Sequence, residues 1–371
     1  MGRTAMDQLL PCHSIRAFPT AGGRSDLAPA AGGNGMVCRT MSAQRREEKE
    51  RRRRRKHLIQ GLLVGSAAIG LPALFNAFVS RRARRLAPVS WGSGSRYAWR
   101  HGEIVFQRLG EGAPVVLLHA FGPGHSAAEW RQVAEHLAAR RQVLVPDLLG
   151  WGLSDKPRLA YDDELYVSLI TDFLRDVVGS RAVLVGAGLS AAYAVQVAAD
   201  VPELVRALGL VVPFGIARGA DEPDLKDAVV HRLLRLPVVG TSALNAFTSR
   251  SGIANYLRRE VFASQQLVDD ALIDEHYRLS HQPGAHAALA AYLSGYLNHG
   301  VRDVLARVEV PAWLAWGRHA SSPAIETADL WLRRLPRAEL EVFERCGALP
   351  HAESPAELSR KLERFLDDLG E

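Results

Sequence analysis

The feature that most limits the possible folds of this chain is a series of short apolar runs that alternate with helical segments from residue 114 onward. The runs show little polar alternation, as strands do in a parallel sheet that is covered on both faces. They are PVVLLHA (114–120), RQVLVPD (141–147), RAVLVGAG (181–188), VRALGLVVP (205–213), PAWLAWG (311–317) and AELEVFE (338–344). Between them apolar residues recur on one helical face, as in Leu358, Leu362 and Phe365. Strand followed by helix, repeated, predicts a doubly wound, mostly parallel α/β sheet.

Two other segments complete the predicted domain. YAWRHGEIVFQRLG (97–110) predicts a hairpin that turns at His101-Gly102. Residues 214–305 contain helical stretches such as DLKDAVVHRLLRL but no convincing strand. We therefore expect a core built from residues 91–213 and 306–371 and a helical cap over residues 214–305. The cap would cover the carboxyl ends of the strands, where open α/β sheets bind ligands.

The last helix carries a start signal of its own. Ser354 is the expected N-cap, Pro355 occupies the first turn, and Glu357 follows three residues after the serine. This spacing predicts a capping box, in which the serine and glutamate side chains each bind a backbone N–H group of the first turn.

The first ninety residues differ from the rest in composition. Residues 1–57 predict a disordered basic tail, rich in Gly, Ala, Ser and Pro before RREEKERRRRRKH (45–57). Part of that tail could also come from translation upstream of a true start at Met36 or Met41. Residues 58–80 carry no charged side chain and are followed by RRARR (81–85). This length predicts a single transmembrane helix, although its glycines, proline, Gln60 and Asn76 would also suit a buried or interfacial helix.

The charge of the chain is concentrated around this apolar segment. Residues 45–56 hold nine basic and three acidic side chains, and residues 81–85 add four basic ones, whereas the whole chain has a net charge of +6. The globular part is therefore net acidic, which argues against a nucleic-acid-binding face. We expect residues 45–85 to bind anionic membrane lipid. The basic excess before the helix favours a globular part on the extracytoplasmic side.

Cysteine usage gives no sign of a disulfide framework or a metal site. The chain has three cysteines, and two of them, Cys12 and Cys38, lie in the predicted tail. No metal-ligand spacing is present. We expect neither a metal nor a cofactor.

Five motifs in the globular part follow one another in a recognisable order. They are LLHAFG (117–122), PDLLGWGLSDKP (146–157), LVGAGLSAAYA (184–194), LAWGRHA (314–320) and CGALPHAESPAEL (346–358). With these motifs, residues 95–370 resemble the α/β-hydrolase family with a helical cap, which includes esterases, epoxide hydrolases and haloalkane dehalogenases. The resemblance implies an oxyanion hole made by the backbone N–H groups of Phe121 and Leu189, with His119 opening the oxyanion loop.

The same resemblance places a nucleophile, an acid and a histidine at three positions that lack them. The nucleophile position in the strand-to-helix turn is Gly188, the acid position after WG-x-x is Ala320, and the histidine position after Cys-Gly is Ala348. Nucleophilic catalysis in this family needs all three side chains. Glycine at 188 would also remove the backbone strain of a turn residue with positive φ.

Other residues near these motifs leave a displaced site open. Ser190 lies two residues after the empty nucleophile position, and His351 lies three residues after the empty histidine position. His319 and Glu353 are further candidates for proton transfer. Asp147, Ser154 and Asp155 are expected to hold the shape of their turn. Ser190 and His351 would form a catalytic pair only within hydrogen-bond reach of each other and facing the cavity under the cap.

Three functions are consistent with these patterns. The first is a membrane-tethered protein without hydrolytic activity that binds a lipophilic ligand or a protein partner. The second is an active hydrolase or lyase built on Ser190 and His351. The third is chemistry without cofactor or nucleophile in the same pocket.

Overall fold

The computed structural model describes residues 34–370 except 84, 86–90, 93 and 218–222. The chain divides into two units, residues 1–65 and 66–371. Helix α1 (Asn34–Ala83) passes through the boundary between these units, so each part is considered separately. Residues 1–33 of the predicted tail lie outside the described residues.

Helix α1 begins well before the predicted apolar segment. Residues 34–57, predicted as part of a disordered tail, are helical in the structure. Arginine, lysine and glutamate are good helix formers, and no glycine or proline interrupts residues 45–57. The predicted membrane helix over 58–80 lies inside α1. Among the residues that the structure describes, no helix is both long enough and apolar enough to cross a bilayer.

The described strands form one eight-stranded sheet in the order β1-β2-β4-β3-β5-β6-β7-β8. Strand β2 is antiparallel to both of its neighbours, and β3 to β8 are parallel. The strands are β1 (Ser95–Trp99), β2 (Gly102–Leu109), β3 (Pro114–Leu118), β4 (Gln142–Pro146), β5 (Ala182–Ala187), β6 (Val205–Val211), β7 (Ala312–Gly317) and β8 (Ala338–Phe343). The predicted doubly wound, mostly parallel sheet is confirmed, and each of the six apolar runs contains one of its strands.

The hairpin turns one residue earlier than predicted. Trp99 pairs with Gly102, so Arg100 and His101 form the turn. Gly102 has a φ of +151°, and a Cβ at this position would lie 2.8 Å from the Cβ of Asp155. The glycine is therefore needed where β2 begins against the turn that contains Asp155, and not at the tip of the hairpin.

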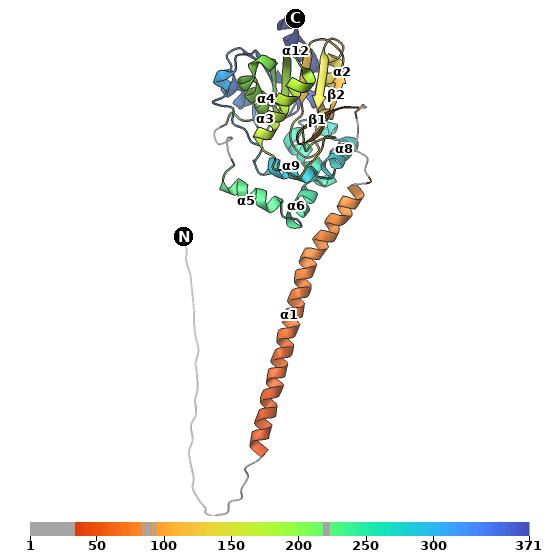
Figure 1. Ribbon diagram of the computed structural model, residues 1–371, viewed down its shortest axis with the longest axis vertical. Coiled ribbons are helices and arrows are strands. Elements are labelled where there is room, and N and C mark those ends of the chain that lie inside the picture. The colour runs from red at the N-terminus through yellow and green to blue at the C-terminus, as the bar shows by residue number, and fades with distance from the viewer. Residues whose placement is uncertain (1–33, 84, 86–90, 93, 218–222, 371) are drawn as a thin grey trace, which may run out of the picture. The chain divides into compact units, whose positions relative to one another are not determined.

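Helices cover the sheet and a separate group of helices forms the cap (Figure 1). The helices near the sheet are α2 (Arg131–Leu137), α3 (Asp163–Phe173), α4 (Leu189–Asp200), α10 (Ala328–Leu332), α11 (Pro350–Glu353) and α12 (Pro355–Asp368). The cap helices are α5 (Leu225–Leu234), α6 (Val239–Phe247), α7 (Arg250–Tyr256), α8 (Asp270–Ser280) and α9 (Ala285–Leu293). All the cap helices fall between β6 and β7, and the described residues there contain no strand.

The start of α12 differs from the expected capping box. Ser354 is its N-cap residue and Pro355 its first residue, but the Ser354 side chain makes no capping hydrogen bond. The hydroxyl instead bonds to Cys346. Glu357 lies 3.4 Å from Lys361 Nζ, in an ion pair on the helix surface. The hydrogen bond to Cys346 and the ion pair with Lys361 have therefore replaced the capping box that the sequence suggested.

Candidate functional site

A cavity of about 490 Å³ lies where the cap meets the carboxyl ends of the strands. The loop after β3 contributes Ala120 and Phe121, and the turn after β5 contributes Gly188 and Leu189. The cap contributes Tyr256 among other side chains. The cavity thus occupies the place that the sequence predicted for a ligand.

Gly188 forms the sharp turn from β5 into α4. Its φ and ψ are +59° and −118°, a backbone conformation that side chains other than glycine rarely adopt. A Cβ here would be in ordinary contact, 3.7 Å from the Phe214 ring and 4.0 Å from Ala120 Cβ. A side chain would therefore fit the cavity, and backbone strain would be its main cost.

The acid and histidine positions also lack reactive groups. Ala348 lines the cavity, and Ala320 is 6% exposed just after β7. A methyl group can neither transfer a proton nor orient an imidazole. The cavity therefore contains no side chain of the usual triad at the three positions where the family motifs place it.

The structure does not bring Ser190 and His351 together. Ser190 is fully buried, and its hydroxyl donates to the His119 carbonyl oxygen over 2.5 Å. His351 stacks on Trp130, with ring centroids 3.9 Å apart and an interplanar angle of 14°. Its Nε2 lies 3.1 Å from Glu129 Oε1. Neither residue lines the cavity under the cap.

The remaining candidates hold the surrounding loops. His119 is fully buried between the Ala120 carbonyl oxygen, 2.6 Å from Nδ1, and the Leu148 N–H group, which donates to Nε2 over 3.0 Å. Burial lowers the pKa of His119, so the ring is neutral. Glu353 accepts backbone N–H groups from Gly347, Ala263 and Ser264. His319 is exposed.

The turn after β4 is fixed by its acidic and hydroxyl side chains. Asp147 accepts the Ala127 N–H group at Oδ1 over 2.7 Å and the Leu153 N–H group at Oδ2 over 2.8 Å. Ser154 donates to the Asp147 carbonyl oxygen, and Asp155 accepts the Glu103 N–H group. These side chains satisfy backbone donors and do not line the cavity.

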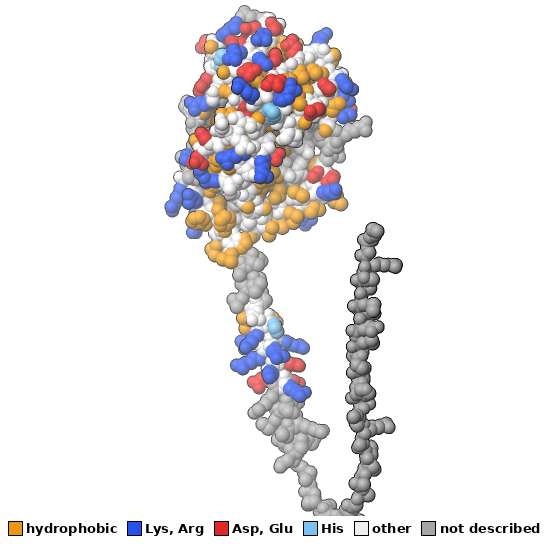
Figure 2. Space-filling view, turned by 180° about the vertical axis from the view of Figure 1, so that it is seen from behind, with side chains coloured by type: hydrophobic (Ala, Val, Ile, Leu, Met, Phe, Trp, Pro, Cys, Tyr) orange, Lys and Arg blue, Asp and Glu red, His pale blue; other side chains and the backbone are white. Residues whose placement is uncertain are grey.

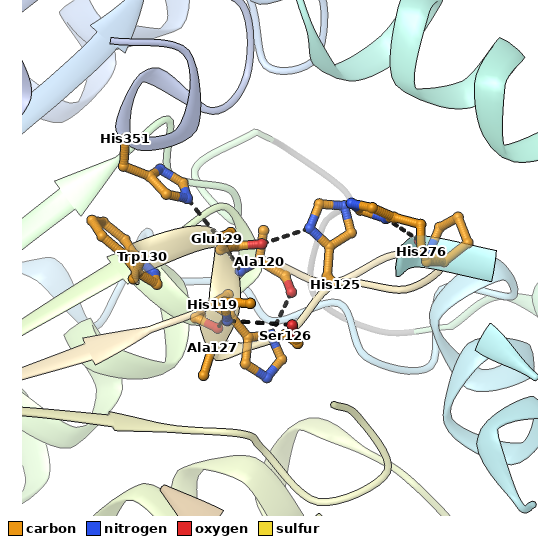
Figure 3. Close-up of polar contacts among 12 residues, drawn as sticks. His119, Ala120, His125, Ser126, Ala127, Glu129, Trp130, His276 and His351 are labelled. Atoms are coloured by element: carbon orange, nitrogen blue, oxygen red, sulfur yellow. Dashed lines mark hydrogen bonds and ion pairs between the residues drawn. The ribbon is translucent and has the colours of Figure 1, made fainter. Parts of the chain in front are cut away.

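A buried carboxylate that the sequence analysis missed lies beside the oxyanion loop. Glu129, in the short helix η1 (Ala127–Trp130), accepts the Ala120 N–H group at Oε1 over 2.6 Å. Its Oε2 lies 2.7 Å from His125 Nδ1. His125 and His351 approach this carboxylate from opposite sides (Figure 3). The sequence signal was the spacing of His125 and Glu129, four residues apart directly after the oxyanion motif.

The cluster reaches the cavity through His125. Its Nε2 lies 3.2 Å from the Tyr256 hydroxyl, and both residues line the cavity. Burial alone would raise the pKa of Glu129, but hydrogen bonds and charge interactions with His125 and His351 outweigh it and hold that pKa well below its usual range. Burial raises the pKa of Tyr256 well above its usual range. Glu129 is therefore the anion of the cluster, and Tyr256 keeps its proton.

The expected oxyanion pair remains available. Leu189 is the first residue of α4, so its N–H group has no partner within the helix. For the N–H group of Phe121, no hydrogen bond is present among the described residues. Both residues line the cavity. The cavity thus has, in its lining residues, two backbone donors of the kind that stabilise a developing negative charge.

Comparison with known proteins identifies the class. The model of the alpha/beta hydrolase family matches residues 115–361. This chain belongs to the α/β hydrolase family, as its motifs indicated.

Individual relatives are distant. An uncharacterized protein of Mycobacterium tuberculosis strain H37Rv is 28% identical over 78% of this chain and 86% of its own length. The 2-hydroxymuconate semialdehyde hydrolase of Pseudomonas sp. strain CF600 is 29% identical over 69% of this chain and 88% of its own. A solved structure described as a membrane phospholipase A has a TM-score of 0.60 and 22% identity, and the match covers 85% of this chain and 99% of that one.

Two cap histidines are held neutral. His276 Nδ1 lies 2.8 Å from the Pro123 carbonyl oxygen, and burial, with a smaller effect of His125, lowers the pKa of His276 to about 4. Burial, with a smaller effect of His281, likewise lowers the pKa of His286 to about 4. The His286 Nε2 is buried without a hydrogen-bond partner.

We predict that Gly188→Ser lowers the free energy of unfolding by about 1 kcal/mol or more, because the new Cβ must adopt the strained conformation. Gly70→Ser is the control, because it places a side chain inside helix α1 with no atom within 4 Å of the new Cβ. This control should leave stability unchanged or raise it. Calorimetry measures both. An unchanged melting temperature for Gly188→Ser would show that residue 188 lacks the positive φ.

The two cap histidines predict a loss of stability in mild acid. The unfolded chain binds a proton at each histidine below about pH 6.5, whereas folded His276 and His286 remain neutral down to about pH 4. The free energy of unfolding therefore has its full value with respect to these two groups above pH 6.5. It decreases as the pH falls toward 4, by at most about 1.4 kcal/mol per pH unit for each histidine. Denaturant unfolding should show a shallower pH dependence for His276→Gln and for His286→Gln, and the shallowest for the double variant. Identical profiles in all four proteins would contradict the assignment.

Proposed function

We propose that this protein is a catalytically degenerate member of the α/β hydrolase family that binds a lipophilic ligand carrying a carbonyl group. The observation that carries the proposal is the combination of an open cavity with alanine or glycine at all three triad positions. Gly188 and Ala348 line that cavity, and Ala320 is buried after β7. Without these side chains, no covalent intermediate can form at the usual place.

The lining of the cavity supports this class of ligand. Apolar side chains such as Phe121, Val212 and Phe214 form much of its wall. Its polar side chains are His125, Asp227, Tyr256, Glu260, Tyr292, Asn298 and Ser322, and Phe121 and Leu189 add the two backbone N–H groups described above. Ligand sites of this kind bury the apolar part of a ligand and orient it by a small number of polar groups. The 2-hydroxymuconate semialdehyde hydrolase similarity is consistent with a carbonyl compound as ligand.

An active hydrolase built on Ser190 and His351 is the alternative. It is disfavoured because Ser190 donates to a backbone carbonyl oxygen and His351 is held by Glu129 and Trp130. A general base must lie within hydrogen-bond reach of its nucleophile.

We predict no nucleophile-dependent turnover of p-nitrophenyl esters, epoxides or haloalkanes by the wild-type protein. Loss of triad members commonly costs several powers of ten in rate, while roughly 10³-fold acceleration over water can remain from oxyanion contacts and binding. Gly188→Ser combined with Ala320→Asp and Ala348→His should create ester turnover and labelling by a fluorophosphonate probe. The matched control carries Ala320→Asp and Ala348→His without the serine and should show neither.

The outcome that contradicts the proposal is specific. Robust wild-type turnover and probe labelling that are abolished by Ser190→Ala or His351→Ala would establish the displaced site instead.

We further propose that residues 45–85 bring the protein to membrane lipid. The last turns of α1 support this part of the proposal. Asn76 is 8% exposed, donates to Val238 O over 3.2 Å and Ser242 Oγ over 3.0 Å, and accepts from Asn245 Nδ2 over 2.9 Å. Its neighbour Phe75 is 53% exposed. One face of this helical segment therefore contacts α6, and another presents apolar side chains outward.

The exposed apolar surface continues onto the cap. Hydrophobic side chains gather at the cap end of the globular part (Figure 2). The large exposed ones on α1, α5 and α6 include Leu71, Leu74, Phe75, Phe78, Leu225, Val229, Val230, Leu233 and Val239. Arg81 and Arg82 follow directly on α1. Apolar side chains flanked by arginine are typical of helices that lie in the membrane interface. The likeness to a structure described as a membrane phospholipase A is consistent with this location.

We predict that the full chain floats with vesicles that contain anionic lipid and that high salt does not release it. Resistance to alkaline carbonate would establish the single transmembrane helix over 58–80, and release by carbonate would establish an interfacial helix. Leu74→Glu with Phe78→Glu should reduce binding, because the exposed apolar face becomes charged. The control, Gln132→Glu with Ala139→Glu, adds the same charge on and beside α2. A wild-type protein that remains unbound at low salt would refute the membrane proposal.

A further inference from the structure

The strongest unassigned feature is the row of side chains that runs from Glu129 through His125 to Tyr256. Glu129 Oε2 accepts from His125 Nδ1 over 2.7 Å, and His125 Nε2 lies 3.2 Å from the Tyr256 hydroxyl. In the neutral tautomer that carries its proton on Nδ1, toward the carboxylate, Nε2 accepts a hydrogen bond from the Tyr256 hydroxyl, which also bonds to the Tyr292 hydroxyl. The row therefore presents a proton acceptor to the cavity, with a tyrosine hydroxyl between that acceptor and a ligand.

The carboxylate is arranged to stabilise positive charge on His125. Glu129 is nearly buried, with 9% of its side chain exposed, and its other donors are the Ala120 N–H group and His351. The His125 side chain is 1% exposed. When His125 takes up a second proton, the resulting imidazolium forms a charge-assisted hydrogen bond to a fixed carboxylate. A hydrogen bond of this kind orients and strengthens the base in enzymes that use a histidine.

The row lies beside the oxyanion donors. Gly122 directly follows Phe121, and a Cβ on Gly122 would collide with the Tyr256 hydroxyl and lie 3.1 Å from His125 Nε2. On the other side, a Cβ on Gly188 would lie 4.0 Å from Ala120 Cβ. His125, Tyr256, Phe121 and Leu189 thus all line the same cavity, and Gly122 places Phe121 next to the base and the hydroxyl.

We propose that Glu129, His125 and Tyr256 form an acid–base site that interconverts the keto and enol forms of a lipophilic carbonyl compound. The C–H bond next to the carbonyl breaks, and its proton moves to Tyr256 Oη while the Tyr256 proton moves to His125 Nε2. The electron pair of that C–H bond forms the C=C bond, and the π pair of the carbonyl moves to its oxygen, which gives the enolate. The enolate oxygen is held by the N–H groups of Phe121 and Leu189. Reversal of the same transfers restores the ketone, whereas return of the proton from His125 through Tyr256 to the enolate oxygen gives the enol; either route restores neutral His125 without a co-reactant.

This inference rests on the proposed function, because the cavity must first bind a carbonyl compound. It does not use residues 188, 320 or 348, since no bond to the protein is formed. Tyr256 contacts the ligand and His125 takes the transferred proton from Tyr256, so these two are the catalytic residues. Glu129 is a positioning residue that acts through His125.

The test measures hydrogen–deuterium exchange at the carbons next to the carbonyl of 2-decanone in deuterated buffer, by proton NMR. Binding of the same ketone is measured separately by saturation-transfer NMR. We expect the wild-type protein to bind the ketone and to accelerate exchange. His125→Gln and Tyr256→Phe should slow the exchange roughly a hundredfold or more, as expected for loss of an acid–base group, while binding remains. Glu129→Gln should lower the turnover rate more than the apparent affinity and should change its pH profile. His136→Gln, on the surface of α2, should behave as wild type.

Three other outcomes would contradict different parts of the proposal. If the ketone binds but exchange equals the buffer rate, or is equal in wild type and His125→Gln, the acid–base site is refuted and the proposed ligand-binding function stands. If Tyr256→Phe alone retains full exchange, the transfer does not pass through Tyr256 as proposed. If the ketone does not bind, the proposed ligand class is refuted together with this inference.

Discussion

The hydrogen bonds to the Glu129 carboxylate are the interaction on which the arrangement of the site depends. This one nearly buried group holds the backbone of the oxyanion loop at Ala120, a cavity histidine at His125 and the short helix α11 at His351. A buried carboxylate is tolerated when several donors satisfy it. Removing any one donor would leave the charge under-compensated, so the three segments are fixed relative to one another by a shared electrostatic requirement.

The sheet was predictable from sequence because its strands are buried on both faces. Runs such as RAVLVGAG and PAWLAWG have no polar alternation, and in both cases the strand lies inside the run. Details set by local patterns were less predictable. The hairpin turn lies one residue before the predicted one, and Gly102 instead begins β2 in contact with Asp155. The Ser354 hydroxyl bonds to Cys346 and does not form the predicted capping box. In both places the structure depends on a contact with a residue outside the local pattern.

The site was only partly predictable for a related reason. Family motifs located the three empty positions and the two oxyanion donors, because these depend on local spacing. Glu129 meets His351 across 222 positions of sequence, and His125 meets Tyr256 across 131. No local pattern reveals such pairs, and the fold alone brings them together. For Ser190, proximity in sequence left a displaced nucleophile open, and its hydroxyl binds a backbone carbonyl oxygen.

The positive φ of Gly188 also bears on how this protein can evolve. A lineage that acquires a side chain at residue 188 introduces backbone strain with the first substitution. Catalysis by a triad would also need substitutions at residues 320 and 348. Selection acts on single steps, so each intermediate variant would carry the backbone strain without a complete triad. Glycine at the turn from β5 into α4 therefore disfavours each single step toward a side chain at residue 188. With glycine at this turn, new chemistry is reached in fewer substitutions from the other residues of the cavity than from residue 188.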